Sequence, residues 1–415
     1  MIKGLMRDKS RSRLPVIVVS IGVMLTVFMH AYINGFMGDT LEMNARFSYG
    51  HVKVMTRAYA EEMNQNPNDL ALIGVEELRE ELAEMFPGMD WVARIQFGGL
   101  VDVPDENGET RSQGTVMGMG LDLLTDGTGE LDRLGIGRSL VRGSLPKEAG
   151  QVLLSETFSR NLDIDPGETI TLIGSSMNGS LVMANFTVIG TLSFGVEAMD
   201  RGTIIMDIED ARLALDMEDA AGEIIGFLPG GFYDDEQARR FARVFNAQYA
   251  DDPDAFAPVM KSLSQQGSMG AYVKISEVWG LYVSGIFIFA MSLVLWNAGL
   301  LGGLRRYGEV GIRLAMGEDK GHVYRSMIYE SIVIGFVGSV LGTAVGLFFA
   351  WLLQEYGIDI SGMMEGASMM MPSVIRARIT TPDFFIGFIP GVVSTVIGTM
   401  LAGIGIYKRQ TAWLF

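Results

Sequence analysis

Residues 305–346 read RRYGEVGIRLAMGEDKGHVYRSMIYESIVIGFVGSVLGTAVG, a charged segment that leads into a long apolar one. On a helical wheel at about 100° per residue, one narrow arc holds the charged side chains Arg305, Glu309, Arg313 and Lys320. The opposite arc holds Leu304, Tyr307, Val310, Gly311, Leu314 and Ala315. The pattern predicts a short amphipathic helix at a membrane surface, between two apolar segments.

The charged stretch 304–326, here called the elbow, contains signals for the ends of its helices. Glu309 precedes Arg313 in the favourable order for an intrahelical ion pair, but an exposed pair contributes only about 0.3–0.5 kcal/mol. Helix stability therefore does not explain these charges. Gly317 allows the chain to leave the first helix, and Asp319 is placed to cap the next one. We expect the elbow to join its two apolar neighbours rigidly.

The elbow also resembles a known family. The pattern of glycines and charges, followed by Glu330 and a glycine-rich apolar helix, is similar to FtsX/MacB-type ABC transporter permeases, and within them to the LolC/LolE lipoprotein-release permeases. The resemblance implies a coupling helix that docks on an ATPase subunit through Arg306, Glu309, Arg313, Leu314, Met316 and Gly317. The charges taken alone would equally fit any basic loop between membrane helices.

Composition sets the broad class of the chain. Its 415 residues are 48% hydrophobic with a mean hydropathy of +0.27, which allows a soluble domain and several membrane spans. The absence of cysteine excludes disulfides and thiolate metal sites. A formal charge of −17 argues against nucleic acid as a partner. The acidic residues concentrate in 38–276, whereas the elbow and residues 1–13 are rich in Lys and Arg.

Four apolar runs are long enough to cross a hydrocarbon core of about 30 Å. They are residues 14–37, 277–303, 327–353 and 384–407. A cleaved signal peptide is the alternative for the first run, but no Ala-x-Ala site follows it. The basic residues at 1–13, at 304–326 and at 408–415 place these segments in the cytoplasm. The sequence thus predicts a multi-pass protein of the inner membrane, with 38–276 and the loop 354–383 outside.

The outer segment 38–276 shows the short alternating runs of an α+β domain. Strands are predicted at 50–56, 92–103 and 113–119, helices at 74–86 and 234–249, and a small barrel or sandwich at 151–206. The string GQVLLSETFSRNLDIDPGETITLIG at 150–174 resembles the β-rich outer subdomain of the lipoprotein-release permeases. That resemblance implies a β-rich insert at about 92–222 within a single α+β domain.

Several other features have mainly structural interpretations. His30, His51 and His322 are too scattered to form one site, although His30 and Asn34 could face a chamber inside the first span. A stripe of glycines on the third span favours close helix packing: Gly335, Gly338, Gly342 and Gly346. The Met-rich string 361–371 could bind Cu(I), but without His or Cys it better fits an adaptable apolar surface.

No phosphate-binding G-x-x-x-x-G-K-[ST] motif occurs in the sequence. The chain itself is therefore expected to be neither an enzyme nor a binder of cofactors or metals, with ATP and Mg bound by a partner ATPase. The resemblance implies a second permease copy or homologue and a periplasmic lipoprotein carrier. No carrier-docking segment is recognisable in 50–273, so peptide or drug efflux through an adaptor, as in MacB-like permeases, stays open. An FtsX-like activator of a cell-wall hydrolase is the alternative from a different class.

A lipidated cargo would leave the bilayer between the first span of one permease and the second span of its partner. An apolar, deformable chamber is expected there, lined by Met24, Phe28, Met37, Met43, Phe287, Phe289 and Met291. Any membrane helix presents such side chains to lipid, so the lipid-facing interpretation also stays open.

Overall fold

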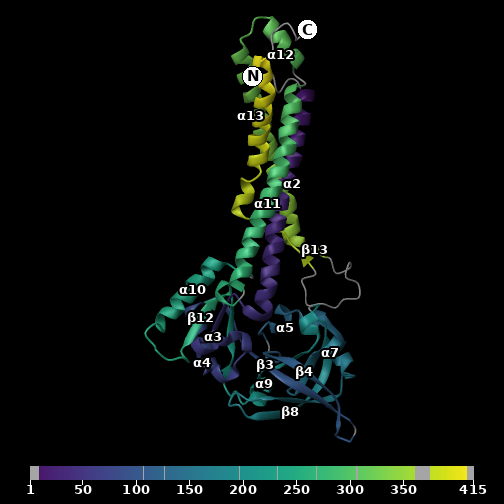
Figure 1. Cartoon of the computed structure of the whole chain (residues 1–415), viewed down its shortest axis with the longest axis vertical. Coiled ribbons are helices and arrows are strands. Elements are labelled where there is room, and N and C mark those ends of the chain that lie inside the picture. Colours follow the sequence, from purple (N-terminus) through teal and green to yellow (C-terminus); the bar gives the residue numbers. More distant parts are fainter. Residues whose placement is uncertain are drawn as a thin grey trace. The chain divides into compact units, whose positions relative to one another are not determined.

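The computed structural model describes residues 9–105, 107–125, 127–195, 197–230, 232–267, 269–304, 307–359 and 374–408. The chain divides into two compact units. A helical unit is formed by Met1–Asp39, Ile275–Ile360 and Val374–Phe415, and an α/β unit contains Thr40–Lys274. Figure 1 labels the helices and strands of both units.

Four segments of the structure are long and apolar enough to cross a membrane, as the sequence predicts. The first three are the helices α2 (Lys9–Asn44), α11 (Met269–Leu304) and α13 (Lys320–Tyr356), each of which extends beyond its apolar run. The fourth differs from the predicted continuous helix. It comprises η6 (Thr381–Phe384), the π-helical η7 (Ile389–Ser394) and α14 (Thr395–Lys408), because Pro390 cannot donate a backbone hydrogen bond.

The glycine stripe of α13 is a packing surface. A Cβ atom added to Gly338 would lie 2.6 Å from Val19 Cγ1, and one added to Gly342 would lie 2.5 Å from the Ser20 carbonyl oxygen. A Cβ atom added to Gly335 would lie 2.9 Å from the Gly391 carbonyl oxygen of η7. The α2 backbone therefore lies directly on α13, which confirms the packing interpretation of the stripe.

Leucine in place of Gly342 should push α2 away from α13 and lower the free energy of unfolding by about 1–3 kcal/mol. Thermal unfolding in detergent would measure the loss. Gly285→Leu on α11 is the matched control, because a Cβ atom there meets no described residue within 4 Å. Equal losses in the two variants would contradict the packing interpretation.

The α/β unit is built on two strand systems that share the long strand β3 (Asp90–Pro104). The first half of β3 pairs with β11 (Glu223–Phe227) in a sheet that continues through β1 (Val52–Thr56) to β12 (Pro258–Ser262). Its second half pairs with both β4 (Thr110–Leu121) and β7 (Thr169–Ser175).

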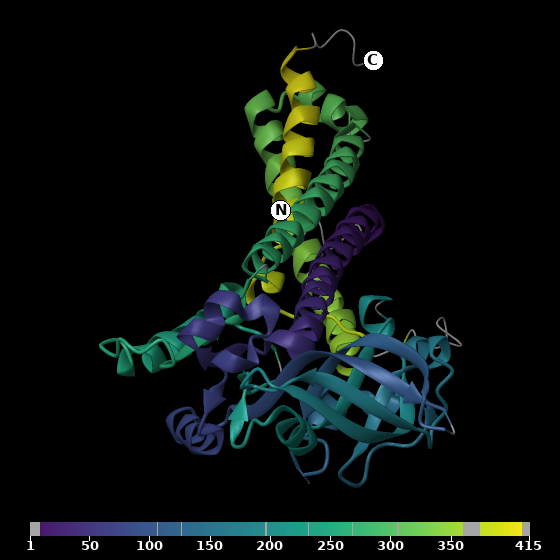
Figure 2. The same cartoon turned by 60° about the horizontal axis from the view of Figure 1, so that its bottom comes forward.

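The second strand system closes on itself. From β4 the pairing continues through β9 (Thr203–Asp207), β6 (Gln151–Ser155) and β8 (Leu181–Leu192) to β7, which returns to β3. A short strand, β5 (Leu140–Gly143), extends β8. The strands curve around one another in Figure 2. Of the two predicted architectures, barrel or sandwich, the structure shows the barrel.

Two helices beside the open sheet match the prediction. α4 (Val75–Met85) contacts β3, and α10 (Asp235–Gln248) contacts β12. α4 begins after Gly74, which has the left-handed φ of +71°, and the Asp234 side chain accepts a hydrogen bond from the Gln237 N–H at the start of α10. The two-residue strands β2 (Leu72–Ile73) and β10 (Ala220–Ala221) pair with each other as a separate small sheet.

Several buried charges inside the α/β unit are paired. Arg94 and Glu130 are fully buried and joined by two hydrogen bonds of 2.9 and 3.2 Å, and Lys53 lies 2.7 Å from Glu223. His51 accepts the Leu228 N–H at Nδ1, so its Nε2 carries the proton that faces Glu42 at 2.9 Å. His51 is therefore structural, as expected.

Candidate coupling site

The elbow is a helix–turn–helix with a defined turn. α12 (Tyr307–Ala315) ends in a Schellman motif, in which the Glu318 N–H donates to the Arg313 carbonyl and the Gly317 N–H donates to that of Leu314. Gly317 has a φ of +91°, a left-handed conformation that a glycine adopts without strain. Asp319 then caps α13 by accepting the His322 N–H at 3.1 Å. The predicted roles of Gly317 and Asp319 are confirmed.

Arg313 has a partner that helical spacing does not reveal. Its guanidinium donates two hydrogen bonds to the Glu318 carboxylate, at 2.6 and 2.7 Å. The turn at Gly317 folds Glu318 back toward α12. The helical spacing of Glu309 and Arg313 gives no sign of this ion pair within the chain, and pairing of Arg313 with a docked ATPase stays a prediction. The hydrogen bonds raise the pKa of Arg313 and lower that of Glu318, so both groups stay ionised and brace the turn.

One face of α12 is tied to α13. Val310 is buried together with Val323 and Met327, and Leu314 packs against this cluster. Leu314 is therefore half-buried against its own chain, and its predicted contact with an ATPase stays a prediction. This apolar seam makes α12 and the start of α13 one stiff element.

The outward face of α12 combines charges with large apolar side chains. Ile312 is 60% exposed and Met316 is 75% exposed, close to Glu309 and Arg313 on the helical wheel. Met316 is one of the predicted coupling residues, whereas Ile312 is not. The sequence alone could have indicated Ile312. An isoleucine within the charged arc of an amphipathic helix cannot pack on its apolar side, and an exposed apolar side chain of this kind can mark a binding surface. Arg306, also predicted here, lies outside the described residues.

A polar cluster links the first and fourth membrane segments. His30 Nδ1 lies 2.7 Å from Asp383 Oδ1, and the Asn34 amide lies 3.2 Å from the same nitrogen. The other carboxylate oxygen of Asp383 accepts the backbone N–H and the hydroxyl of Thr380, at 2.6 and 2.8 Å. Asp383 is fully buried. His30 therefore faces a carboxylate of its own chain, and its place in a chamber wall stays a prediction.

Two family models match the chain. The MacB-like periplasmic core domain covers residues 14–266, more than half of the chain, and the FtsX-like permease C-terminal domain covers residues 281–411. The chain belongs to the FtsX/MacB-type ABC transporter permeases. Accordingly, its four candidate transmembrane segments and large β-rich domain are those of a transporter membrane subunit with a periplasmic-type domain.

Curated relatives of this permease include the macrolide export ATP-binding/permease protein MacB of Neisseria meningitidis serogroup A, 27% identical over 119 residues, or 28% of this chain and 17% of that protein. The same protein of Hyphomonas neptunium is 25% identical over 79 residues, 19% of this chain and 12% of the relative. The matches thus span less than a fifth of these relatives. A solved periplasmic region of MacB from Actinobacillus actinomycetemcomitans is similar at 12% identity and a TM-score of 0.35, covering 55% of this chain and 92% of that one.

The structure places the predicted chamber residues of the permease in different surroundings. Phe28 packs beside Ala350 and Leu353 of α13, and a Cβ atom added to Gly22 would lie 3.1 Å from Met291 Cε. Phe28 and Met291 therefore serve contacts within the chain. Phe289 is exposed on α11, whereas the remaining four are half-buried: Met24, Met37, Met43 and Phe287. The Met-rich string 361–371 lies outside the described residues.

Proposed function

We propose that this permease couples ATP hydrolysis in a separate ATPase to extraction of an amphipathic substrate at the outer face of the inner membrane. The observation that carries the proposal is the exposed pair Ile312 and Met316, held on a helix that the Gly317 turn, the Asp319 cap and the seam with α13 make stiff. A stiff element transmits force from a docked protein, whereas a flexible loop would absorb it. Two copies or homologues of the permease would form the transmembrane part.

These 415 residues lack the glycine-lysine motif of a phosphate-binding loop, so ATP would bind outside them. ATP and Mg would bind in the partner ATPase. On the outer side, the acidic α/β unit would lie in the periplasm, since the basic residues cluster in the segments assigned to the cytoplasm.

Lipoproteins are the cargo that we propose, released from the membrane by this permease. In α11, only 11% of an apolar stretch of 18 residues is buried within the chain. The corresponding share is 39% in each of the other three spans. A helix that its own chain covers so little can contact a partner permease, and it can also contact an acyl chain that leaves the bilayer sideways. A periplasmic carrier would then receive the lipoprotein.

Macrolide export is a second candidate, and a specific observation favours it. The curated relatives matched over parts of this chain are named for that activity. The two candidates differ in what contacts α11, because a lipoprotein brings acyl chains and a macrolide does not.

Photo-crosslinking from Phe289 is expected to capture a lipoprotein in the absence of ATP and to lose it when nucleotide binds to the complex. Mass spectrometry of the adduct would identify the cargo. Phe349 on α13 is the control, because it is also an exposed phenylalanine and should report bulk lipid. Adducts with phospholipid only, or competition by a macrolide, would rule out lipoprotein release and leave the permease assignment intact.

A further inference from the structure

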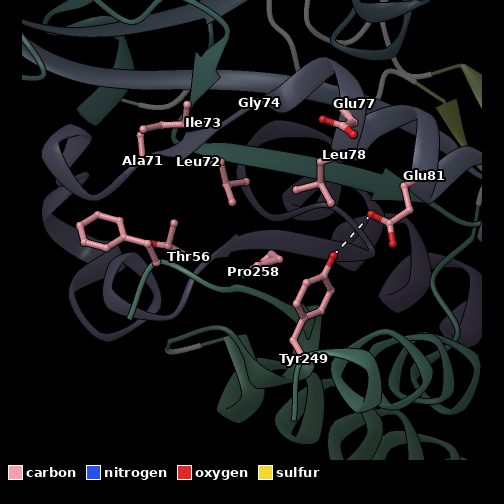
Figure 3. A pocket seen from close by; sticks show the side chains of 11 residues that line it. Thr56, Ala71, Leu72, Ile73, Gly74, Glu77, Leu78, Glu81, Tyr249 and Pro258 are labelled. Carbon is pink, nitrogen blue, oxygen red and sulfur yellow. Dashed lines mark hydrogen bonds between the residues drawn. The ribbon is translucent and has the colours of Figure 1, made fainter. Parts of the chain in front are cut away.

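The α/β unit contains a pocket that the coupling mechanism does not use. It has a volume of about 360 Å³, within the size range of sites that bind small ligands or single side chains. Most of its lining residues are apolar, with Leu72, Leu78 and Pro258 around the centre and Tyr249 at one side (Figure 3), although polar atoms contribute nearly as much of the lining surface. The lining residues come from β2, α4, the end of α10 and the start of β12.

Two large apolar side chains of this pocket are open to solvent. Ile73 is 71% exposed, and Phe256 is 50% exposed. Exposed apolar groups beside a concave apolar surface are typical of binding sites, whereas single ones scattered over a surface are ordinary.

The backbone that carries these side chains is braced. Ile73 pairs with Ala220 in the β2–β10 ladder, and the two following N–H groups, of Gly74 and Val75, donate to the Asp219 carbonyl. The Phe256 N–H donates to the Asp254 side chain at 3.0 Å. The flanking Ala255 and Ala257 carbonyls accept hydrogen bonds from the backbone at 57–58. The pocket is therefore preformed, which lowers the entropic cost of binding.

The rim of the pocket is acidic. Glu77 and Glu81 project from α4 along one side in Figure 3, and the Tyr249 hydroxyl lies 3.4 Å from Glu81. Burial and the nearby Glu81 raise the pKa of Tyr249, so the phenol stays neutral and acts as the donor. Further acids lie on the same helix and on the loop before Phe256 but do not line the pocket: Glu80, Glu84, Asp251, Asp252 and Asp254. The Arg57 guanidinium is engaged by the Tyr249 and Asp252 carbonyls. Arg79, the basic residue of α4, is 2.7 Å from Glu76.

An apolar hollow with an acidic rim is complementary to an apolar group flanked by cations. We propose that this pocket docks an extended segment of a partner protein, in which an aliphatic or aromatic side chain is flanked by lysine or arginine. The apolar side chain would fill the space between Leu72, Leu78 and Pro258. The cations would lie over Glu77 and Glu81. The site belongs to the permease alone and does not depend on the ATPase.

The test uses the full chain in nanodiscs and three dye-labelled peptides with Gly/Ser flanks. Their cores are Lys-Leu-Leu-Lys, Glu-Leu-Leu-Glu and Ser-Leu-Leu-Ser, and fluorescence anisotropy measures each Kd. We expect the lysine peptide to bind at least tenfold more tightly than the glutamate peptide. Ile73→Ala and Phe256→Ala should each weaken it by about tenfold. Leu213→Ala, at an exposed leucine of α9 (Ile208–Leu215) that does not line the pocket, should leave the Kd unchanged.

A charge reversal makes the test specific. The double variant Glu77→Lys with Glu81→Lys should invert the preference and favour the glutamate peptide, whereas Glu84→Lys, on the same helix but outside the pocket lining, should not. Equal affinity for all three peptides would mean an unselective apolar site and overturn the proposal. So would the absence of saturable binding, or a preference that survives the charge reversal. Because no ATPase is present, these outcomes are independent of the coupling function.

Discussion

Aspartate at both Ile312 and Met316 should release the ATPase from the permease. Among the described side chains, Ile312 is exposed on the outward face of α12 and Met316 is exposed directly after its last residue. An apolar anchor at the centre of an interface contributes about 2 kcal/mol or more. Losing two anchors, and burying two charges in their place, should weaken association by at least about a hundredfold. Copurification of the complex and stimulation of ATP hydrolysis would both report the loss.

Two controls separate docking from folding. His322→Asp adds an acid at a similarly exposed site of the elbow, on α13 instead of α12, and should leave the complex intact. The double variant should retain wild-type thermal unfolding, because Val310, Val323 and Met327 still hold α12 on α13. A double variant that keeps its ATPase, or a control that loses it equally, would refute the docking role of this face.

Among the single substitutions that we predict for the helical unit, Asp383→Ala should be the most destabilising. It removes the acceptor of the Thr380 N–H and hydroxyl and leaves His30 without its carboxylate in a buried setting. A buried polar group that loses its hydrogen-bond partner costs about 1–3 kcal/mol, so the loss of these contacts together should cost about 3–5 kcal/mol. Asn34→Ala removes only one peripheral contact and should cost about 1 kcal/mol. Thermal unfolding in nanodiscs would compare the two.

The interaction energy of the pair comes from a double-mutant cycle. His30→Ala combined with Asp383→Ala should cost clearly less than the sum of the two single losses, because the second substitution removes a group that the first has already left unpaired. Strictly additive losses would show that the two side chains do not interact in the membrane.

The four spans could be predicted because each is an apolar run of sufficient length, a property of local sequence. The barrel could not be distinguished from a sandwich. Closure depends on β7 pairing with β3, and strands so far apart in sequence carry no local sign of their partner. The fourth segment was predicted as a plain helix because the effect of Pro390 on its first turns was not considered.

At the elbow, the capping residues followed from local chemistry, since Gly317 and Asp319 act on backbone groups within a few residues. The partner of Arg313 did not, because Glu318 reaches it only after the chain reverses at Gly317. The packing of Leu314 on α13 did not follow either, since a helical wheel gives the apolar side of a helix but not what covers it. Asp383 was overlooked because its role depends on His30, a residue from another span.

A photo-crosslinker at position 316 tests the central claim most directly. In the purified complex, it should form a covalent adduct with the ATPase, since Met316 is exposed at the end of the stiff α12. The same crosslinker at Ile73, in the α/β unit that we place across the membrane, should form none. An adduct from Ile73, or none from position 316 in a complex that still contains the ATPase, would contradict the assignment of the elbow as the coupling site.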